Sequence, residues 1–205
     1  MTSPDSIVPP SVPQGRRIGL LGGSFNPAHQ GHRYISQQAL KRLRLDEVWW
    51  LVSPQNPLKP TAGMGLLAER MAAARAVARD RRIRVSDLES RLGTRYTIDT
   101  LRALRRRFPG ARFVWLMGAD NLEQIARWKG WQEIFATLPI AVFDRPAYSL
   151  PALSSQAARR FAGRRVREQQ ADRLATLPPP AWVFLHGRLH PASATAIRAG
   201  KGARA

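Results

Sequence analysis

Short apolar runs alternate with longer amphipathic segments along most of this chain. The apolar runs have the length and composition of strands that are buried on both faces of a sheet. They lie at residues 17–21, 48–52, 83–85, 112–117, 140–143 and 182–185. Between them, apolar residues recur every three or four positions, as in helices that bury one face. The pattern therefore predicts helices at residues 31–45, 64–79, 97–108, 121–127 and 131–138.

The order of these elements predicts the fold class. The strand at 17–21, the helix at 31–45 and the strand at 48–52 form a βαβ unit, which implies parallel strands joined by a right-handed crossover. Because the alternation continues, we expect a single α/β domain with a doubly wound parallel sheet of five or six strands. In such a sheet, ligands bind at the carboxyl ends of the strands, where the strand order reverses.

The two ends of the chain lack this pattern. Residues 1–16 are polar and Pro-rich and have no apolar segment like that of a secretion signal, so we interpret them as a disordered leader. Residues 17–200 then form the domain, and 201–205 a basic tail. We expect residues 151–177 to be helical or partly ordered, and 193–198 to form a short final helix.

The chain is strongly basic, since its 33 Lys and Arg against 14 Asp and Glu give a net charge of +19 over 205 residues. This balance favours an anionic partner, such as nucleic acid, a phosphorylated metabolite or an acidic membrane surface. Arginine clusters at 105–107, 159–160 and 164–165 would suit nucleic acid, but the familiar nucleic-acid-binding motifs are missing, so that function is the weaker alternative.

Two absences in the sequence narrow the classes of function further. The chain has no cysteine, which excludes disulfides, thiolate metal sites and a cysteine nucleophile. It also lacks an apolar run of about 18 residues, so we expect no membrane span. A cytoplasmic protein is the simplest interpretation.

The most informative motif is Gly-Gly-Ser-Phe-Asn-Pro-Ala-His-Gln-Gly-His at residues 22–32, between the first predicted strand and helix. Gly22 and Gly23 would allow a close approach of the backbone to a ligand and unusual φ values. The helix N-terminus would offer N–H groups to an anion. His29 and His32 would project from one face toward the same anion. A metal site at this pair would lack a third ligand nearby, and the motif is not a P-loop.

As a whole, this string resembles the GGSFNPxHxGH signature of the HxGH nucleotidyltransferase superfamily, and within it the bacterial nicotinate-nucleotide adenylyltransferases. Further segments resemble the same family in the same order. They are 52–59 (with Asn56 for Pro and Leu58 for His), 89–101 (with Arg95 for Ser), 118–131, and 192–198 (with Ala192 for Ile and Ala194 for Ser). The resemblance covers residues 17–200 and implies a Rossmann-like nucleotidyltransferase fold.

The reaction implied by the resemblance is that of ATP with nicotinate mononucleotide, giving deamido-NAD and pyrophosphate in NAD biosynthesis. The phosphate oxygen of the mononucleotide would attack the α-phosphorus of ATP directly, so catalysis would rest on alignment and charge stabilisation. Mg²⁺ would be held mainly by ATP phosphates and water, without a protein metal site. A preference for nicotinamide mononucleotide, or dual specificity, stays open, as does the oligomeric state.

The resemblance also implies roles for individual residues. His29 and His32 are the expected catalytic residues, with His32 the stronger candidate for contact with the transition state. The expected ATP and phosphate contacts are Gly22, Gly23, Ser24, Phe25, Lys59, Ser193, Thr195 and Arg198. The expected mononucleotide contacts are Tyr96, Thr97, Asp120, Trp128 and Lys129.

Within the mononucleotide site, the indole of Trp128 would stack on the pyridinium ring. Backbone N–H groups near Thr97 and Lys129 would receive its carboxylate, and Asp120 would accept a ribose hydroxyl. Trp131, which the spacing places on the same helical face as Trp128, is expected in the core. Asp99 fits a helix cap as well as a ligand contact.

Overall fold

The computed structural model describes residues 11–54, 63–145 and 148–187. These residues form one parallel sheet with the strand order β3-β2-β1-β4-β5-β7-β6. Its strands are β1 (Arg17–Gly23), β2 (Glu47–Val52), β3 (Ile83–Ser86), β4 (Arg112–Gly118), β5 (Ile140–Phe143), β6 (Arg165–Val166) and β7 (Trp182–Leu185). The doubly wound α/β class is therefore confirmed. The sheet has seven strands, whereas the sequence predicted five or six. The strand that was missed is β6, whose two residues are too short to form an apolar run.

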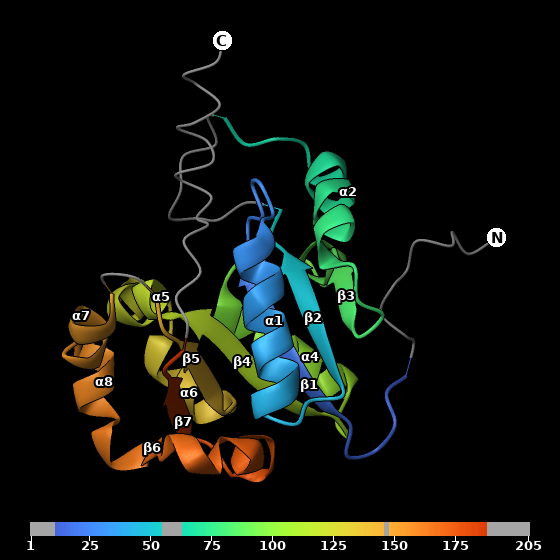
Figure 1. Cartoon of the computed structure of the whole chain (residues 1–205). Coiled ribbons are helices and arrows are strands. Elements are labelled where there is room, and N and C mark those ends of the chain that lie inside the picture. The colour runs from blue at the N-terminus through green and yellow to red at the C-terminus, as the bar shows by residue number, and fades with distance from the viewer. Residues whose placement is uncertain (1–10, 55–62, 146–147, 188–205) are drawn as a thin grey trace.

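Helices cover both faces of the sheet, with α1 in front of it and α4 behind it (Figure 1). The first face carries α1 (Gln30–Arg42), α2 (Leu67–Ala78) and the 3₁₀ segment η3 (Glu168–Thr176). The second carries α3 (Leu88–Arg91), α4 (Thr97–Arg107), α5 (Ala119–Gln124), η1 (Ile125–Arg127), α6 (Trp131–Thr137), α7 (Ser149–Leu153) and α8 (Gln156–Arg160). A short turn, η2 (Ala162–Arg164), leads into β6.

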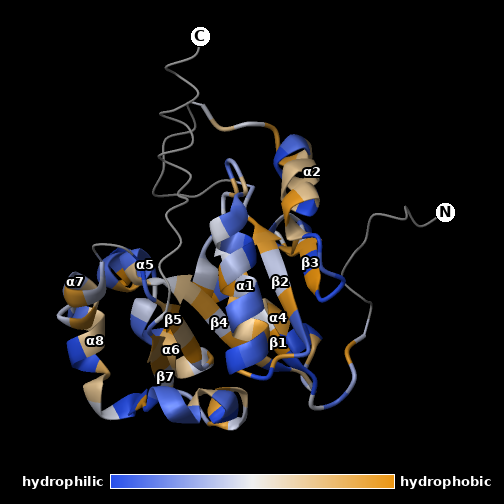
Figure 2. Cartoon of the chain, viewed as in Figure 1, coloured by the Kyte–Doolittle hydropathy of each residue, from blue (hydrophilic) through white to orange (hydrophobic). Residues whose placement is uncertain are grey.

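The central strands bury side chains on both faces, which explains their uninterrupted apolar runs. In β2, Trp49 and Leu51 pack with α4 and α6, while Val48, Trp50 and Val52 pack with α1 and α2. Hydrophobic colour accordingly gathers on the strands, and hydrophilic colour on the outer helix turns (Figure 2). A sheet covered in this way is accessible to ligands mainly at its strand ends.

The strand order reverses between β1 and β4. β2 and β3 lie on one side of β1 in the sheet. β4 lies on its other side, and beyond β4 the strands lie in the order β5, β7, β6. The connections after β1 and β4 therefore run to opposite faces of the sheet, β1 into α1 and β4 into α5. This is the switch point, where doubly wound sheets bind ligands. The Gly22–Gly23 pair ends β1, and Gly118 ends β4.

Part of the predicted leader contacts the domain. Val12 packs against the core, and the N–H of Gly15 donates to the carbonyl of Gly110 (2.8 Å). Residues 1–10 and 201–205 lie outside the described residues, so for them the assignment stays a prediction. In the described ranges, no helix combines the length and hydrophobicity needed to cross a membrane. The cytoplasmic location likewise stays a prediction.

Candidate active site at the switch point

The two histidines of the first motif meet at the start of α1. His29 is the N-cap residue and is buried, and His32 lies in the first turn. The N–H of Gly31 donates to Nδ1 of His29 (3.1 Å), and the N–H of His29 donates to Nδ1 of His32 (3.2 Å). The two ring centroids are 3.9 Å apart. The prediction that both rings lie together on one side of the helix is thus confirmed.

These hydrogen bonds also decide where each neutral imidazole carries its proton. Because Nδ1 of His29 and of His32 accepts an N–H, the proton of each neutral ring lies on Nε2. The sequence analysis expected the backbone N–H groups here to bind an anion directly. Instead, the N–H groups of Gly31 and His29 are used on the rings, and each ring carries an Nε2–H donor.

Phe25 lies beneath the histidine pair. Its side chain is 2% exposed, and its ring stacks on Trp50 (centroids 5.0 Å apart) and touches His32 (4.7 Å). The indole N–H of Trp50 donates to Ser36 Oγ (2.8 Å), and the Ser36 hydroxyl donates to the carbonyl of His32 (2.9 Å). Phe25 therefore supports His32 from below, and the ATP contact expected for this residue stays a prediction.

The two glycines at the end of β1 differ in how closely other side chains pack against them. Neither Gly22 nor Gly23 has a positive φ, so the unusual backbone conformation expected for them is wrong. A methyl group on Gly22 would overlap Cη2 of Trp115 and lie 3.2 Å from its Cζ2. One on Gly23 would only reach ordinary contact with Phe25, at 3.5 Å. The buried side chain of Trp115, on β4, therefore leaves room only for glycine at position 22.

Asp120 stands at the other side of the switch point, in the first turn of α5. Its Oδ2 accepts a hydrogen bond from Arg145, at the end of β5 (3.1 Å). Its Oδ1 is buried and has no hydrogen-bond donor among the described residues. Because an unpaired buried acceptor costs about 1–3 kcal/mol, a ligand hydroxyl would be favourable here. This arrangement fits the ribose contact expected for Asp120, and it adds Arg145, which the sequence analysis missed.

The other expected mononucleotide residues gather at the start of α4. Nζ of Lys129 lies 4.4 Å from the ring centre of Tyr96 and 3.5 Å from the carboxylate of Asp99. Tyr96 is the N-cap of α4, and Thr97 is its first residue, whose N–H has no acceptor within the helix. Asp99 pairs with Lys129 and does not cap the helix. This end of α4 can therefore receive an anionic group.

Trp128 and Trp131 do not share a helical face, although their spacing suggested it. Trp128 has an extended backbone at the end of η1, and Gly130, with φ +62, starts the separate helix α6. Trp131 is half-buried and packs edge-on against Phe135 and Phe161, while Trp128 is likewise half-buried against the same core cluster, so their separate roles stay a prediction. The half-buried Trp128 lies beside Lys129 in the chain.

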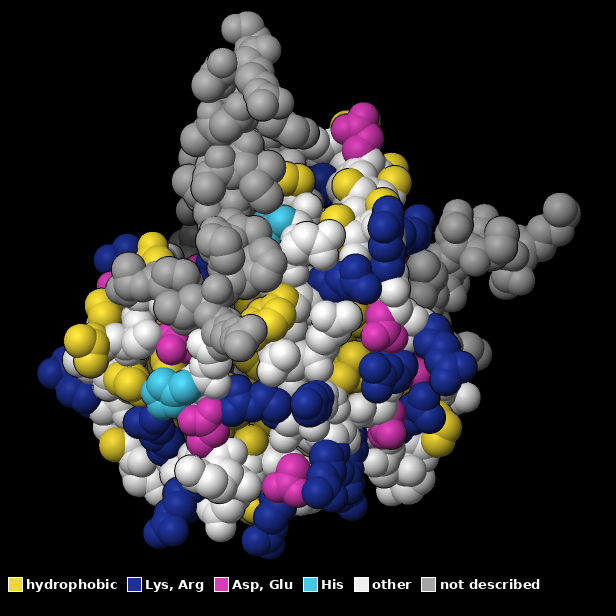
Figure 3. Space-filling model, viewed as in Figure 1, with side chains coloured by type: hydrophobic (Ala, Val, Ile, Leu, Met, Phe, Trp, Pro, Cys, Tyr) yellow, Lys and Arg dark blue, Asp and Glu magenta, His cyan; other side chains and the backbone are white. Residues whose placement is uncertain are grey.

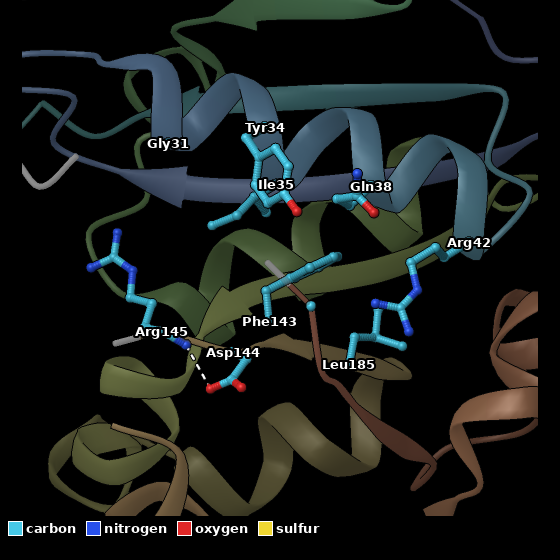
Figure 4. Close-up of a pocket in the computed structure, with 10 residues that line it drawn as sticks. Gly31, Tyr34, Ile35, Gln38, Arg42, Phe143, Asp144, Arg145 and Leu185 are labelled. Carbon is cyan, nitrogen blue, oxygen red and sulfur yellow. Dashed lines mark hydrogen bonds between the residues drawn. The ribbon is translucent and has the colours of Figure 1, made fainter. Parts of the chain in front are cut away.

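An open pocket follows one side of α1, between this helix and the ends of β5 and β7 (Figure 4). It begins at Gly31, between the two histidines in sequence. Its walls come from α1 and from the ends of β5 and β7, and include Tyr34, Gln38, Phe143, Asp144 and Leu185. The sequence analysis missed these residues, because only the strand order brings the three segments together.

A buried carboxyl group lies close behind the glycine pair. Glu89 of α3 is 8% exposed, and burial raises its pKa to about 7, although a hydrogen bond with the Ser53 side chain partly opposes this. The N–H of Ser53 in turn donates to the carbonyl of Gly23 (2.9 Å). Hydrogen bonds through Ser53 thus connect Glu89 to the end of β1.

Replacing Glu89 with glutamine should flatten the dependence of stability on pH. The carboxyl has a pKa near 4.5 when exposed and about 7 when folded, so the folded state loses stability as the pH rises from 4.5 to 7. At about 1.4 kcal/mol per pKa unit, the total loss is at most about 3 kcal/mol. Urea unfolding from pH 5 to 8 measures it, with exposed Glu123→Gln as the control. Parallel pH profiles for the Glu89 variant and the wild type would contradict the prediction.

Four of the expected ATP contacts lie outside the described residues, namely Lys59, Ser193, Thr195 and Arg198, as does the expected helix 193–198. Within the ranges that the structure describes, no three His, Asp or Glu side chains come together as a metal site.

The chain is similar in sequence to proteins of one known family. A family model described as cytidylyltransferase-like matches residues 20–200. A relative from Bradyrhizobium sp. (strain ORS 278) is 60% identical over 182 residues, which cover 89% of this chain and 95% of the relative. One from Methylorubrum extorquens is 56% identical over 182 residues, 89% of this chain and 98% of the relative. Both are named probable nicotinate-nucleotide adenylyltransferase.

Among solved structures, a nicotinic acid mononucleotide adenylyltransferase from Plasmodium falciparum has the same fold. In its complex with NaAD it matches with a TM-score of 0.69 at 15% identity, over 90% of this chain and 83% of that chain. In its complex with APC the TM-score is 0.67 at 14% identity, with the same coverage. At such low identity the likeness supports the fold alone.

Proposed function

The chain belongs to the cytidylyltransferase-like family, where it groups with the nicotinate-nucleotide adenylyltransferases, and we propose that it transfers the adenylyl group of ATP to nicotinate mononucleotide. The products are deamido-NAD and pyrophosphate, in NAD biosynthesis. The observation that carries the proposal is the pair of Nε2–H donors of His29 and His32 at the switch point.

In the proposed reaction, a phosphate oxygen of the mononucleotide attacks the α-phosphorus of ATP. The bond from that phosphorus to the bridging oxygen breaks, and the leaving pyrophosphate takes the electron pair. His29 and His32 donate from Nε2 to the phosphate oxygens, on which negative charge accumulates. Because the rings are already held by backbone N–H groups and by Phe25, little reorganisation is needed during the reaction.

The pocket along α1 supports a place for the adenosine half of ATP. Its lining includes Gly31, which lies between the two histidines in sequence, so a nucleoside whose phosphates meet the rings would extend toward it. Phe143 and Leu185 provide apolar walls, while Gln38 and Asp144 provide polar groups for the base or ribose.

The mononucleotide half is then placed toward α4 and α5. Trp128 and Tyr96 offer aromatic faces for the pyridinium ring, and Asp120 offers its unpaired Oδ1 to a ribose hydroxyl. The N–H of Thr97 can donate to a carboxylate, as can the charged ammonium of Lys129, which also pairs with Asp99 at 3.5 Å. This supports nicotinate as the substrate.

Mg²⁺ is expected with ATP, and when bound it neutralises charge on the triphosphate. The described part of the site presents mainly donors toward the phosphates. Of its carboxylates, Asp120 is hydrogen-bonded to Arg145, and Asp144 lines the pocket along α1. This donor set fits an ion held by phosphate oxygens and water, as expected from the sequence. The described residues of the site would then bind the phosphates, and the phosphate oxygens would coordinate the ion.

The basic surface does not favour nucleic-acid binding as a second function. On the face in Figure 3, Asp and Glu side chains lie between the Lys and Arg side chains, which are spread around the rim. Several arginines are also paired, for example Arg16 and Arg84 with Glu47 at 2.9 and 2.7 Å. Tight binding of nucleic acid at physiological salt would revive this alternative.

A pyrophosphate-release assay tests the proposed function. The purified chain should release pyrophosphate from ATP with nicotinate mononucleotide, with a kcat/KM at least about tenfold higher than with nicotinamide mononucleotide, as one charge-assisted contact allows. A preference for the amide would overturn the substrate assignment. No release with either mononucleotide would overturn the reaction itself.

A further inference from the structure

Arg70 of α2 is a buried arginine for which the proposed mechanism has no use. Its exposed fraction is only 4%. Its guanidinium donates to four backbone carbonyls. Nε bonds Gly65 (2.9 Å), Nη1 bonds Ser24 (2.6 Å) and Ser53 (2.8 Å), and Nη2 bonds Pro54 (3.1 Å). The rigid fork of the guanidinium thus fixes the relative positions of these carbonyls.

The four carbonyls belong to three segments around the switch point. Ser24 directly follows the glycine pair of β1, Ser53 and Pro54 follow β2, and Gly65 precedes α2. The end of β2 is itself tied to β1, since the N–H of Ser53 donates to the carbonyl of Gly23 (2.9 Å). One side chain therefore sets the distance between the loop expected to meet the ATP phosphates and both ends of the β2–α2 connection.

Arg70 also brings a positive charge into the protein interior. Its hydrogen-bond partners are neutral carbonyls, and no Asp or Glu among the described residues forms an ion pair with it. Burial lowers the pKa of Arg70, yet a guanidinium stays charged in proteins. Because an apolar side chain would fill this position without the cost of desolvating a charge, packing alone does not account for an arginine here.

We propose that Arg70 is a positioning residue of the triphosphate site: it holds the Ser24 loop against the β2–α2 connection and places a buried positive charge behind the ATP phosphates. This inference rests on the proposed function, which locates the phosphates beside His29 and His32. Since a charge in the interior is poorly screened, it acts on an anion that it does not touch.

The dependence of binding on the number of ligand phosphates tests the proposal. Calorimetric titrations of the full chain with ATP, ADP and AMP would compare the wild type with Arg70→Met and Arg70→Lys. We expect Arg70→Met to weaken ATP binding at least about tenfold and AMP binding at most about threefold, because the lost attraction scales with phosphate charge. Arg70→Lys should show an intermediate loss, since it keeps the charge but not the fork.

The matched control is Arg75→Met. Arg75 lies on the same helix and is half-buried, so the variant makes the same change in net charge away from these carbonyls. It should bind ATP within about twofold of the wild type. An equal loss of ATP and AMP binding in Arg70→Met would indicate general damage to the fold and overturn the proposal.

If Arg70→Met does not fold, Arg70→Lys decides the question, and wild-type affinity for ATP in that variant would overturn the positioning role. Failure of the proposed function would look different. A wild-type protein that binds ATP but releases no pyrophosphate with nicotinate mononucleotide would disprove the transfer reaction. The comparison of the Arg70 variants would still test the positioning role, because it measures ATP binding alone.

Discussion

Replacing His32 with alanine should lower kcat for adenylyl transfer at least about 100-fold, as expected for the loss of a positioned donor worth about 3 kcal/mol in the transition state. The imidazole carries its proton on Nε2, because Nδ1 accepts the N–H of His29. Alanine removes the donor and has no group to replace it. The measurement is pyrophosphate release at saturating ATP and mononucleotide.

The same substitution removes a hydrogen bond at the start of α1, so stability must be measured alongside activity. We expect a loss of about 1 kcal/mol in urea unfolding, which leaves the protein folded. Gln37→Ala, at an exposed position of α1, is the matched control and should keep wild-type turnover. A His32→Ala enzyme that turns over within about threefold of the wild type would exclude the role assigned to this ring.

Gly22→Ala should destabilise the fold by about 2–3 kcal/mol, whereas Gly23→Ala should cost less than about 1 kcal/mol. The two glycines are adjacent, but only the first faces a buried side chain at close range. A methyl group on Gly22 would overlap the six-membered ring of Trp115, which is 3% exposed and packed on all sides. Midpoints of thermal and urea unfolding measure the difference.

A second substitution separates this overlap from a general loss of glycine. Trp115→Phe shortens the ring that meets Gly22, so the double variant Gly22→Ala, Trp115→Phe should be more stable than the sum of the two single changes predicts. Additive effects would mean that Trp115 does not set the requirement for Gly22. Equal losses for Gly22→Ala and Gly23→Ala would lead to the same conclusion.

The glycine pair also illustrates how far sequence reasoning reaches. The motif marks Gly22 and Gly23 as special and suggests a close approach to a ligand, which stays a prediction, or an unusual φ, which the structure does not show. The structure shows extended strand backbone and a tryptophan from β4, which lies almost a hundred residues further along the chain. A contact of that kind leaves no local periodicity in the sequence, so it could not be inferred from the motif.

The same holds for the aromatic residues of the site. The motif gave no sign that the ring of Phe25 is buried between Trp50 and His32, whether or not the residue also contacts ATP. Trp128 and Trp131 seemed to share a helical face, but Gly130 takes a left-handed conformation and begins a new helix between them. For the two tryptophans, the spacing of residues in the sequence suggested one arrangement of the side chains, and the fold placed them in another.

Local sequence determined the parts of this protein that depend on short-range physics. Apolar runs predicted six of the seven strands, because a strand buried on both faces needs an unbroken hydrophobic segment. Helical spacing predicted the main helices, and the motif at residues 22–32 placed the histidine pair at the start of α1. The α/β class followed from the order of these elements.

The tertiary structure alone decided what depends on strand order. The reversal between β1 and β4 brings His29 and His32 to the same sheet edge as Asp120, and the order β4-β5-β7 places Phe143 and Leu185 along α1. Arg70 contacts carbonyls from the β1–α1 connection and from both ends of the β2–α2 connection in the same way. These contacts join residues far apart in the chain, and their geometry is set by the packing of the whole sheet rather than by the preference of any one segment.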